Sequence, residues 1–152
     1  MKISSNSFKN LGILPNNQVL NDYGLSGKNL SPHLKWEDVP NNAKSLALIC
    51  HDPDAPKLNG WYHWLVLNIP TDVSEFKEGE NISYFETLTD FQKTGYDGAA
   101  PPKGHGKHHY NFTIYALNIE KLDIDKNTQP KIVEDLVKSH AIDSSTITAV
   151  YE

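Results

Sequence analysis

The sequence predicts a mainly β protein, in which antiparallel strands form a sandwich or a barrel and helix is peripheral. Several short runs are rich in β-branched and aromatic residues and are bounded by proline or glycine. Only residues 130–140 carry apolar side chains at helical spacing. The 152 residues contain no internal repeat or linker and are enough for one substantial core. We therefore expect a single domain over residues 1–152.

The first 40 residues are expected to be rich in loops. Turn signals at residues 16–17, 23–24 and 31–32 separate short apolar pieces around Ile3, Leu14 and Val19. We expect short strands and crossing loops in this part of the chain.

Two strong strands are predicted next. Residues 46–50 form a compact apolar run that suits a strand buried on both faces, and the prolines in residues 51–56 prevent its extension. Residues 61–69 form the second strand, which Pro70 ends. Because side chains alternate along a strand, two sets are expected on opposite faces: His63, Leu65 and Leu67 on one, and Tyr62, Trp64 and Val66 on the other.

The later elements are predicted from the same periodicities. Residues 71–91 are expected to be an irregular connection with one short strand, and residues 111–117 a strand. Residues 130–140 are expected to be an amphipathic helix, with Pro130 in its first turn. Residues 145–151 alternate like a strand with one buried face.

The loop of residues 98–110 changes from small residues and prolines to histidines. As the next strand begins, His108 and Tyr110 should share the core-facing side, while His109 points to the other side. A polar pair at the mouth of a core-facing row suggests a pocket. A hairpin loop with surface histidines is the alternative, because loops collect glycine and proline for turn geometry alone.

Composition excludes several classes of function. The net charge is -5, the pI is about 5.8 and no run of Lys or Arg occurs, so nucleic acid is not expected as a partner. The single cysteine, Cys50, lies in an apolar run and should be a buried free thiol in a reducing compartment. No stretch approaches the about 20 apolar residues that cross a bilayer, and we expect a cytoplasmic protein.

Polar side chains occur where the strong strands begin or end. Asp52 follows the first of them, His63 lies near the start of the second, and His108 and Tyr110 precede the third. A common rim would bring together imidazole and phenol donors that suit an oxyanion, assisted by backbone N–H groups of residues 98–100. Asp52 would accept a hydrogen bond from an imidazole and so fix its tautomer.

Four segments together resemble the phosphatidylethanolamine-binding protein family. They are residues 52–56 (DPDAP), residues 60–64 (GWYHW), the loop of residues 98–110, and residues 29–36 (NLSPHLKW). The last of these is similar to the bacterial and archaeal branch, called Raf-kinase-inhibitor-like. The resemblance covers most of the chain, and it implies an antiparallel β-sandwich with a small anion-binding pocket.

The resemblance also implies the pocket residues. The ligand-binding residues would be Asp52, His63, His108 and Tyr110, and the rim would be formed by Pro56, Gly98, Pro101 and Pro102. The chain has His109 where the family usually has arginine, which removes a permanent cation and the salt bridges that it makes. It also has Ala99 and Ala100 where glycine and proline are common.

The expected function is therefore a non-enzymatic binding protein for a small anionic or phosphorylated ligand, such as a lipid headgroup, without metal or cofactor. The resemblance further implies a kinase-inhibitor-like regulator with a protein partner such as a kinase, and a homodimer. The alternative is a small hydrolase or a metal-dependent enzyme that uses Asp52, His63 and His108. No known ligand spacing or nucleophile elbow supports this alternative. We also expect a cis peptide bond before Pro56, in the sharp turn after Asp52.

Overall fold

A computed structural model describes residues 1–152 as two β-sheets and one α-helix. The larger sheet has six strands in the order β2-β9-β8-β4-β5-β7, and the smaller has three in the order β1-β3-β6. In chain order the elements are β1 (Lys2–Ser4), β2 (Gly12–Ile13), a 3₁₀ turn (Asn16–Gln18), β3 (Leu34–Glu37), β4 (Ser45–Asp52), β5 (Trp61–Ile69), β6 (Glu75–Phe76), β7 (Phe85–Glu86), β8 (His108–Leu117), α1 (Pro130–His140) and β9 (Ala141–Tyr151).

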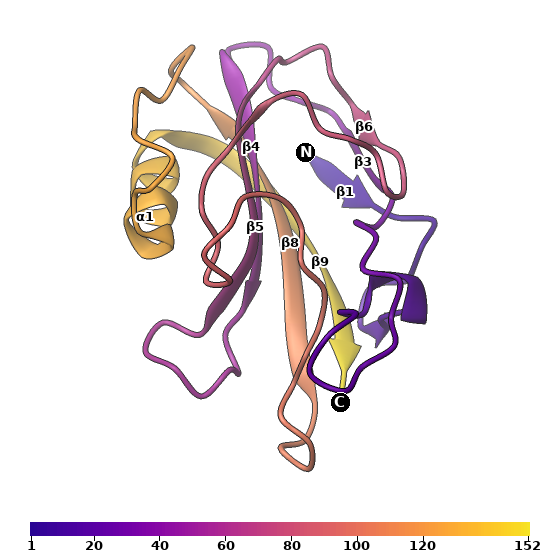
Figure 1. Ribbon diagram of the computed structural model, residues 1–152. Helices are drawn as coiled ribbons and strands as arrows, with labels where there is room; N and C mark the ends of the chain where they lie inside the picture. Colours follow the sequence, from indigo (N-terminus) through magenta and orange to yellow (C-terminus); the bar gives the residue numbers. More distant parts are fainter.

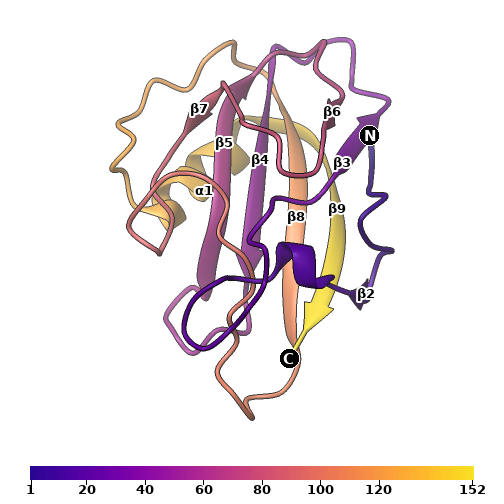
Figure 2. The same ribbon diagram turned by 45° about the vertical axis from the view of Figure 1, so that its right-hand side comes forward.

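The two faces of the larger sheet are covered differently. Helix α1 lies on one side of it, and β1, β3 and β6 lie on the other side, as Figures 1 and 2 show. The helix is 11 residues long, and no helix is both long and apolar enough to cross a membrane. The predicted mainly β architecture is confirmed.

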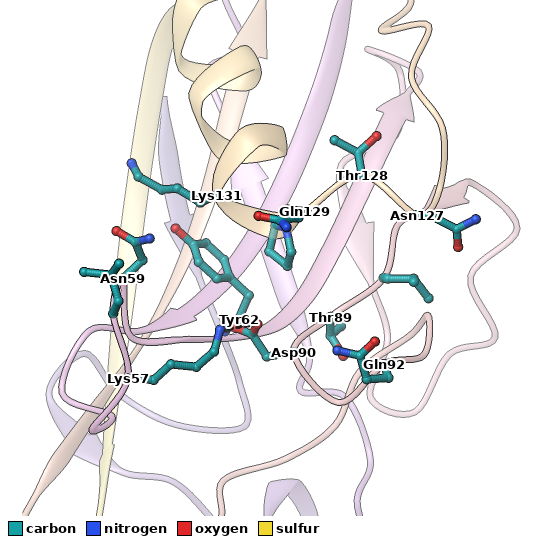
Figure 3. Close-up of a pocket in the computed structure, with 13 residues that line it drawn as sticks. Lys57, Asn59, Tyr62, Thr89, Asp90, Gln92, Asn127, Thr128, Gln129 and Lys131 are labelled. Atoms are coloured by element: carbon teal, nitrogen blue, oxygen red, sulfur yellow. Dashed lines mark hydrogen bonds and ion pairs between the residues drawn. The ribbon is translucent and has the colours of Figure 1, made fainter.

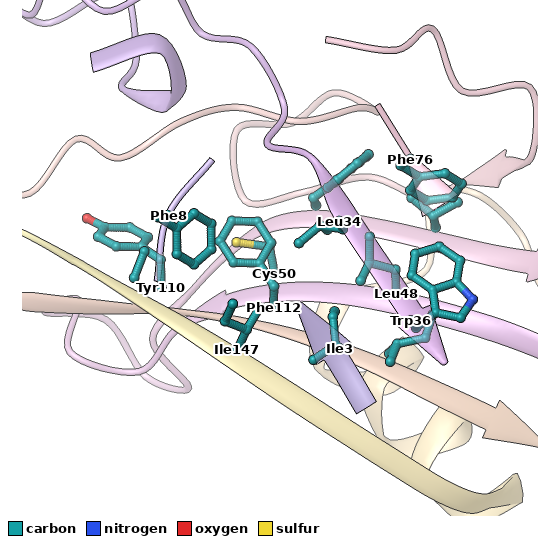
Figure 4. Close-up of a cluster of buried hydrophobic side chains, with 14 of the residues drawn as sticks. Ile3, Phe8, Leu34, Trp36, Leu48, Cys50, Phe76, Tyr110, Phe112 and Ile147 are labelled. Atoms are coloured by element: carbon teal, nitrogen blue, oxygen red, sulfur yellow. The ribbon is translucent and has the colours of Figure 1, made fainter. Parts of the chain in front are cut away.

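Apolar side chains of both sheets meet in one cluster. Trp36 of β3 and Phe76 of β6 pack there with Trp64 of β5 and Phe112 of β8, and all four are at most 1% exposed. Figure 4 shows this cluster, which also contains the buried free thiol of Cys50. Burial on this scale contributes about 2 kcal/mol for each large apolar side chain, so the cluster holds the two sheets together.

Most strands and the helix were predictable. The bounds predicted for β5 and α1 are confirmed, and β4, β8 and β9 each include the predicted residues and begin earlier in the chain. The irregular connection contains two short strands, β6 and β7, where one was expected. One pairing departs from the antiparallel expectation, because β2 runs parallel to β9 at the edge of the sheet.

A bulge in β5 makes the predicted faces wrong for His63 and Tyr62, whereas Leu65 and Leu67 face opposite to Trp64 and Val66 as predicted. Cys50 of β4 pairs with Trp64, but the next residue, His51, pairs with Tyr62, so His63 has no partner opposite. An unpaired residue of this kind shifts the alternation of side chains by one position.

The bulge therefore changes the surroundings of His63. Leu65 and Leu67 were expected on the same face as His63. They pack instead in a second apolar cluster, on the other side of the sheet, with Val133 and Val137 of α1. The ring of His63 instead lies 5.2 Å from the ring of Tyr110, on the side of the sheet that carries the candidate pocket.

Candidate ligand-binding pocket

A pocket of about 240 Å³ lies where β4 ends and where β5 and β8 begin. Seven of the eight predicted site residues line it: Asp52, Pro56, His63, Pro101, Pro102, His108 and Tyr110. Its remaining wall is largely formed by residues that were not predicted, among them Tyr23, Lys57, Trp61, Phe91 and Ala100. A mostly apolar cavity with a few convergent polar groups is the usual form of a small-molecule site.

A chain of hydrogen bonds leads from the pocket to the surface. Nδ1 of His108 lies 2.6 Å from Oδ2 of Asp52, and its Nε2 lies 2.6 Å from Nδ1 of His105. Asp52 and His108 are buried, whereas His105 is exposed on the loop before β8. Since a carboxylate only accepts, Nδ1 of His108 donates to Asp52, as predicted. The contact between the two rings requires one proton between Nε2 and Nδ1.

The turn after β4 is formed without a cis bond. Oδ1 of Asp52 accepts a hydrogen bond of 2.9 Å from the backbone N–H of Asp54, which bends the chain in an Asx turn. All peptide bonds are trans, so the cis bond expected before Pro56 is wrong. The aspartate side chain supplies the curvature that the cis bond was expected to supply.

His63 is held in one tautomer. Its Nδ1 lies 2.8 Å from the carbonyl oxygen of Asp97, so Nδ1 carries the hydrogen. The rings of Phe91 and Tyr110 pack edge-on against it. Burial lowers the pKa of His63, although the nearby carboxylates act against this shift. The ring is therefore neutral at physiological pH.

Two donors in the wall of the pocket have no partner in the protein. Tyr110 is 2% exposed, and its hydroxyl makes no hydrogen bond. In Figure 4 this hydroxyl points away from the apolar cluster. The indole N–H of Trp61 is also buried without a partner. Burial raises the pKa of Tyr110, so its hydroxyl stays protonated and can donate. Unpaired buried donors are costly, and a ligand that accepts from them would remove this cost.

Gly98, which was predicted at the rim, is not among the residues that line the pocket. A Cβ atom at this position would lie 2.1 Å from the carbonyl oxygen of Gln18, and the glycine therefore permits two backbone segments to touch. Its N–H is not free for an anion, because it donates to Oδ1 of Asn29 at 2.7 Å.

The predicted faces of β8 are confirmed. His108 and Tyr110 are buried, and His109 is exposed on the opposite side. His109 has a partner in place of the salt bridges expected to be lost, because its Nδ1 lies 2.8 Å from Oδ2 of Asp54. Partial burial acts to raise the pKa of Asp54, but the hydrogen bonds from His109 outweigh it and lower this pKa.

Sequence reasoning missed His105, Trp61 and Phe91 as parts of the site. The spacing of three residues between His105 and His108 could have suggested contact across the loop. Trp61 stands two residues before His63 on the same strand, which places both on the pocket side. No signal in the sequence identifies Phe91, which comes from a distant loop.

A second pocket of about 400 Å³ lies between the start of α1 and the loops before β5 and after β7 (Figure 3). Its charged side chains already have partners. Lys57 pairs with Asp90 at 2.9 Å, and Lys131 pairs with Asp135 at 2.7 Å. None of the buried polar atoms that lack a partner belongs to its lining. It is therefore the weaker candidate for a ligand site.

The structure does not bring the residues of the metal alternative together as a ligand set. No group of three or more His, Cys, Asp or Glu side chains is placed to hold a metal ion. His51 stacks on Tyr62 at 4.2 Å and contacts the carbonyl oxygen of Asn59, away from His63. Burial raises the pKa of the Cys50 thiol, which makes it a poor nucleophile.

Comparisons with known proteins agree on one family. The family model "Phosphatidylethanolamine-binding protein" matches residues 4–152. The UPF0098 protein YbhB of Escherichia coli is 44% identical over 158 residues, covering 99% of both chains, and YbcL of the same organism is 36% identical over 159 residues, covering 99% of this chain and 87% of YbcL.

Solved structures are similar over the whole chain. The crystal structure of E. coli YbcL, described as a new member of the mammalian PEBP family, superposes with a TM-score of 0.94 at 36% identity and covers 99% of this chain and 97% of that one. A putative phosphatidylethanolamine-binding protein homolog from Chlamydia trachomatis superposes with a TM-score of 0.86 at 30% identity, covering 99% and 96%. With this fold and these relatives, the chain belongs to the phosphatidylethanolamine-binding protein family.

Proposed function

We propose that the protein binds small oxyanions, in particular phosphate-bearing ligands, in the pocket formed by Asp52, His63, His108 and Tyr110. The observation that carries this proposal is the buried hydroxyl of Tyr110, which faces no acceptor in the protein. An oxyanion would supply that acceptor. Lys57, which pairs with Asp90 at 2.9 Å, also lines this pocket.

The negative charge of Asp52 does not prevent anion binding. Its two oxygens accept hydrogen bonds from the N–H of Asp54 and from Nδ1 of His108, at 2.9 and 2.6 Å. These bonds delocalise the charge of the carboxylate. In this proposal the aspartate acts by orienting His108.

Binding without catalysis fits the composition of the pocket. The lining contains no serine, threonine or cysteine that could act as a covalent nucleophile. A hydrolase that activates water is the second candidate, and the carboxylate–imidazole pair of Asp52 and His108 favours it. A kinase-inhibitor-like role and a homodimer stay predictions.

Calorimetric titration tests the proposal. Two charge-assisted hydrogen bonds, reduced by the loss of ligand freedom, give a dissociation constant of roughly millimolar to micromolar for phosphate or O-phosphorylethanolamine. His108→Ala should weaken binding, because it removes the partner of Asp52 and leaves a buried carboxylate. His109→Ala is the matched control on the opposite face of β8 and should bind like the unaltered protein. Equal binding by both variants would contradict the proposal.

A turnover assay separates the two candidate functions. Generic phosphomonoesters and carboxylic esters should remain unhydrolysed by the unaltered protein. Hydrolysis that His108→Ala abolishes would favour the hydrolase instead.

A further inference from the structure

The pocket contains a hydrogen-bond acceptor that an oxyanion alone cannot satisfy. Because Nδ1 of His63 donates to the carbonyl oxygen of Asp97 at 2.8 Å, the neutral ring presents a lone pair at Nε2. Nε2 makes no hydrogen bond within the chain, and His63 lines the pocket. This nitrogen can accept a proton from a ligand, but it cannot donate to one.

The surroundings of His63 keep the ring neutral. Phe91 and Tyr110 enclose it, and His63 itself is 3% exposed. Burial lowers its pKa in spite of the three carboxylates that favour the cation, those of Asp52, Asp90 and Asp97. Each of these carboxylates is paired with another side chain, namely His108 at 2.6 Å, Lys57 at 2.9 Å and Lys93 at 3.1 Å respectively.

The pocket therefore combines donors with acceptors. The hydroxyl of Tyr110 can donate, whereas Nε2 of His63 and the carboxylate of Asp52 can only accept. A ligand oxygen that carries no hydrogen is repelled by these acceptors, because it meets their lone pairs and the negative charge of Asp52. A ligand that carries both an O–H group and an anionic oxygen can pair with both kinds of group.

We propose that the pocket selects the singly protonated form of a phosphoryl group, and hence phosphomonoesters over phosphodiesters and sulfate. In this arrangement the P–O–H group donates to Nε2 of His63, and an anionic oxygen accepts from the hydroxyl of Tyr110. Phosphodiesters and sulfate carry no hydrogen on phosphorus- or sulfur-bound oxygen at neutral pH, so they leave Nε2 unpaired. This inference rests on the proposed function and specifies the ligand class of the same site.

The expected pH dependence is large. With a second pKa of about 6, the singly protonated fraction of a phosphomonoester falls from about one half at about pH 6 to about 1% at about pH 8, so its apparent affinity should fall about 50-fold. Sulfate does not change its protonation over this range. Any change in the affinity for sulfate with pH therefore comes from titration of the protein alone. Dividing the monoester affinity by the sulfate affinity removes this contribution.

Four probes test the inference by calorimetry over this pH range. O-phosphorylethanolamine carries the phosphomonoester on a small molecule, and a capped phosphoserine peptide carries it on a side chain. Whichever of the two binds more tightly shows whether the ligand is a small molecule or a phosphorylated protein. Glycerophosphorylethanolamine keeps the amine but lacks the O–H group, and sulfate serves as the fully ionised anion. At about pH 6 we expect the monoesters to bind at least about tenfold tighter than the diester and sulfate, because an acceptor that a bound ligand covers without pairing is costly.

Two variants assign the selectivity to one nitrogen. His63→Phe removes the acceptor and retains a ring against Phe91, so the preference for monoester over diester should disappear. Tyr110→Phe removes only a donor, so it should weaken all four probes by a similar factor and keep their ratios. Thermal unfolding establishes that both variants fold, and the comparison of probes on the unaltered protein needs no variant.

The outcomes separate this inference from the proposed function. Sulfate and the diester binding as tightly as the monoesters at about pH 6 would overturn the inference and leave an oxyanion pocket. Monoester affinity that does not fall with rising pH, relative to sulfate, would overturn it as well. Binding of none of the four probes would contradict the oxyanion pocket itself, and the inference with it.

Discussion

Replacing Tyr110 by phenylalanine should stabilise the protein and weaken ligand binding at the same time. The Tyr110 hydroxyl is buried without a partner, and leaving such a group unsatisfied costs about 1–3 kcal/mol. We expect Tyr110→Phe to raise the free energy of unfolding by about 1 kcal/mol, which corresponds to about 2–4 °C in Tm for a domain of this size. The same change removes a bond to a charged ligand of about 1.5–3 kcal/mol, so the affinity should fall about 10- to 100-fold.

Urea unfolding of the free protein and calorimetry with O-phosphorylethanolamine measure the two effects. Tyr96→Phe is the matched control, because the Tyr96 hydroxyl donates to the carbonyl oxygen of Gln18 at 2.7 Å and is thus satisfied. Its removal should lower stability by about 1 kcal/mol. The reasoning would be refuted if Tyr110→Phe were as destabilising as Tyr96→Phe and bound ligand normally.

Three further predictions concern pH, backbone packing and the histidine pair. Folding lowers the pKa of His63, so below about pH 6.5 the unfolded chain binds more protons than the folded one. The free energy of unfolding should therefore decrease as the pH falls. Urea unfolding at a series of pH values should show a smaller decrease for His63→Phe. Gly98→Ala should destabilise by more than about 3 kcal/mol because its Cβ meets backbone, whereas Gly104→Ala, with nothing within 4 Å, should cost at most about 1–2 kcal/mol from its positive φ. The protons between His105 and His108 and between His108 and Asp52 should give two downfield ¹H NMR signals, of which His105→Ala removes one, and two such signals in that variant would contradict the 2.6 Å contact between the rings.

Local periodicity explains why so much of the fold was predictable. The bounds of β5 follow from a glycine before and a proline after a continuous apolar run, and those of α1 from Pro130 and a helical spacing of apolar residues. The faces of β8 also followed from alternation, since its pairing with β9 is regular beside the pocket. In these elements the residues that are close in sequence determine the bounds of each element and the faces of its side chains.

The features that could not be predicted depend on contacts between distant segments. The bulge that turns His63 toward the pocket arises from the register between β4 and β5, which the sequence of β5 does not reveal. The role of Gly98 depends on the approach of the segment at Gln18, about 80 residues earlier in the chain. The turn at Asp52 was assigned to proline geometry, although the aspartate side chain itself can form it.

The direct test of the oxyanion pocket is a titration with O-phosphorylethanolamine at about pH 6, followed by ¹H–¹⁵N NMR of the uniformly ¹⁵N-labelled protein. We predict saturable shifts at His63, His108 and Tyr110, with no change at Lys131 in the second pocket of Figure 3. Shifts confined to the second pocket, or no saturable shift at all, would contradict the account.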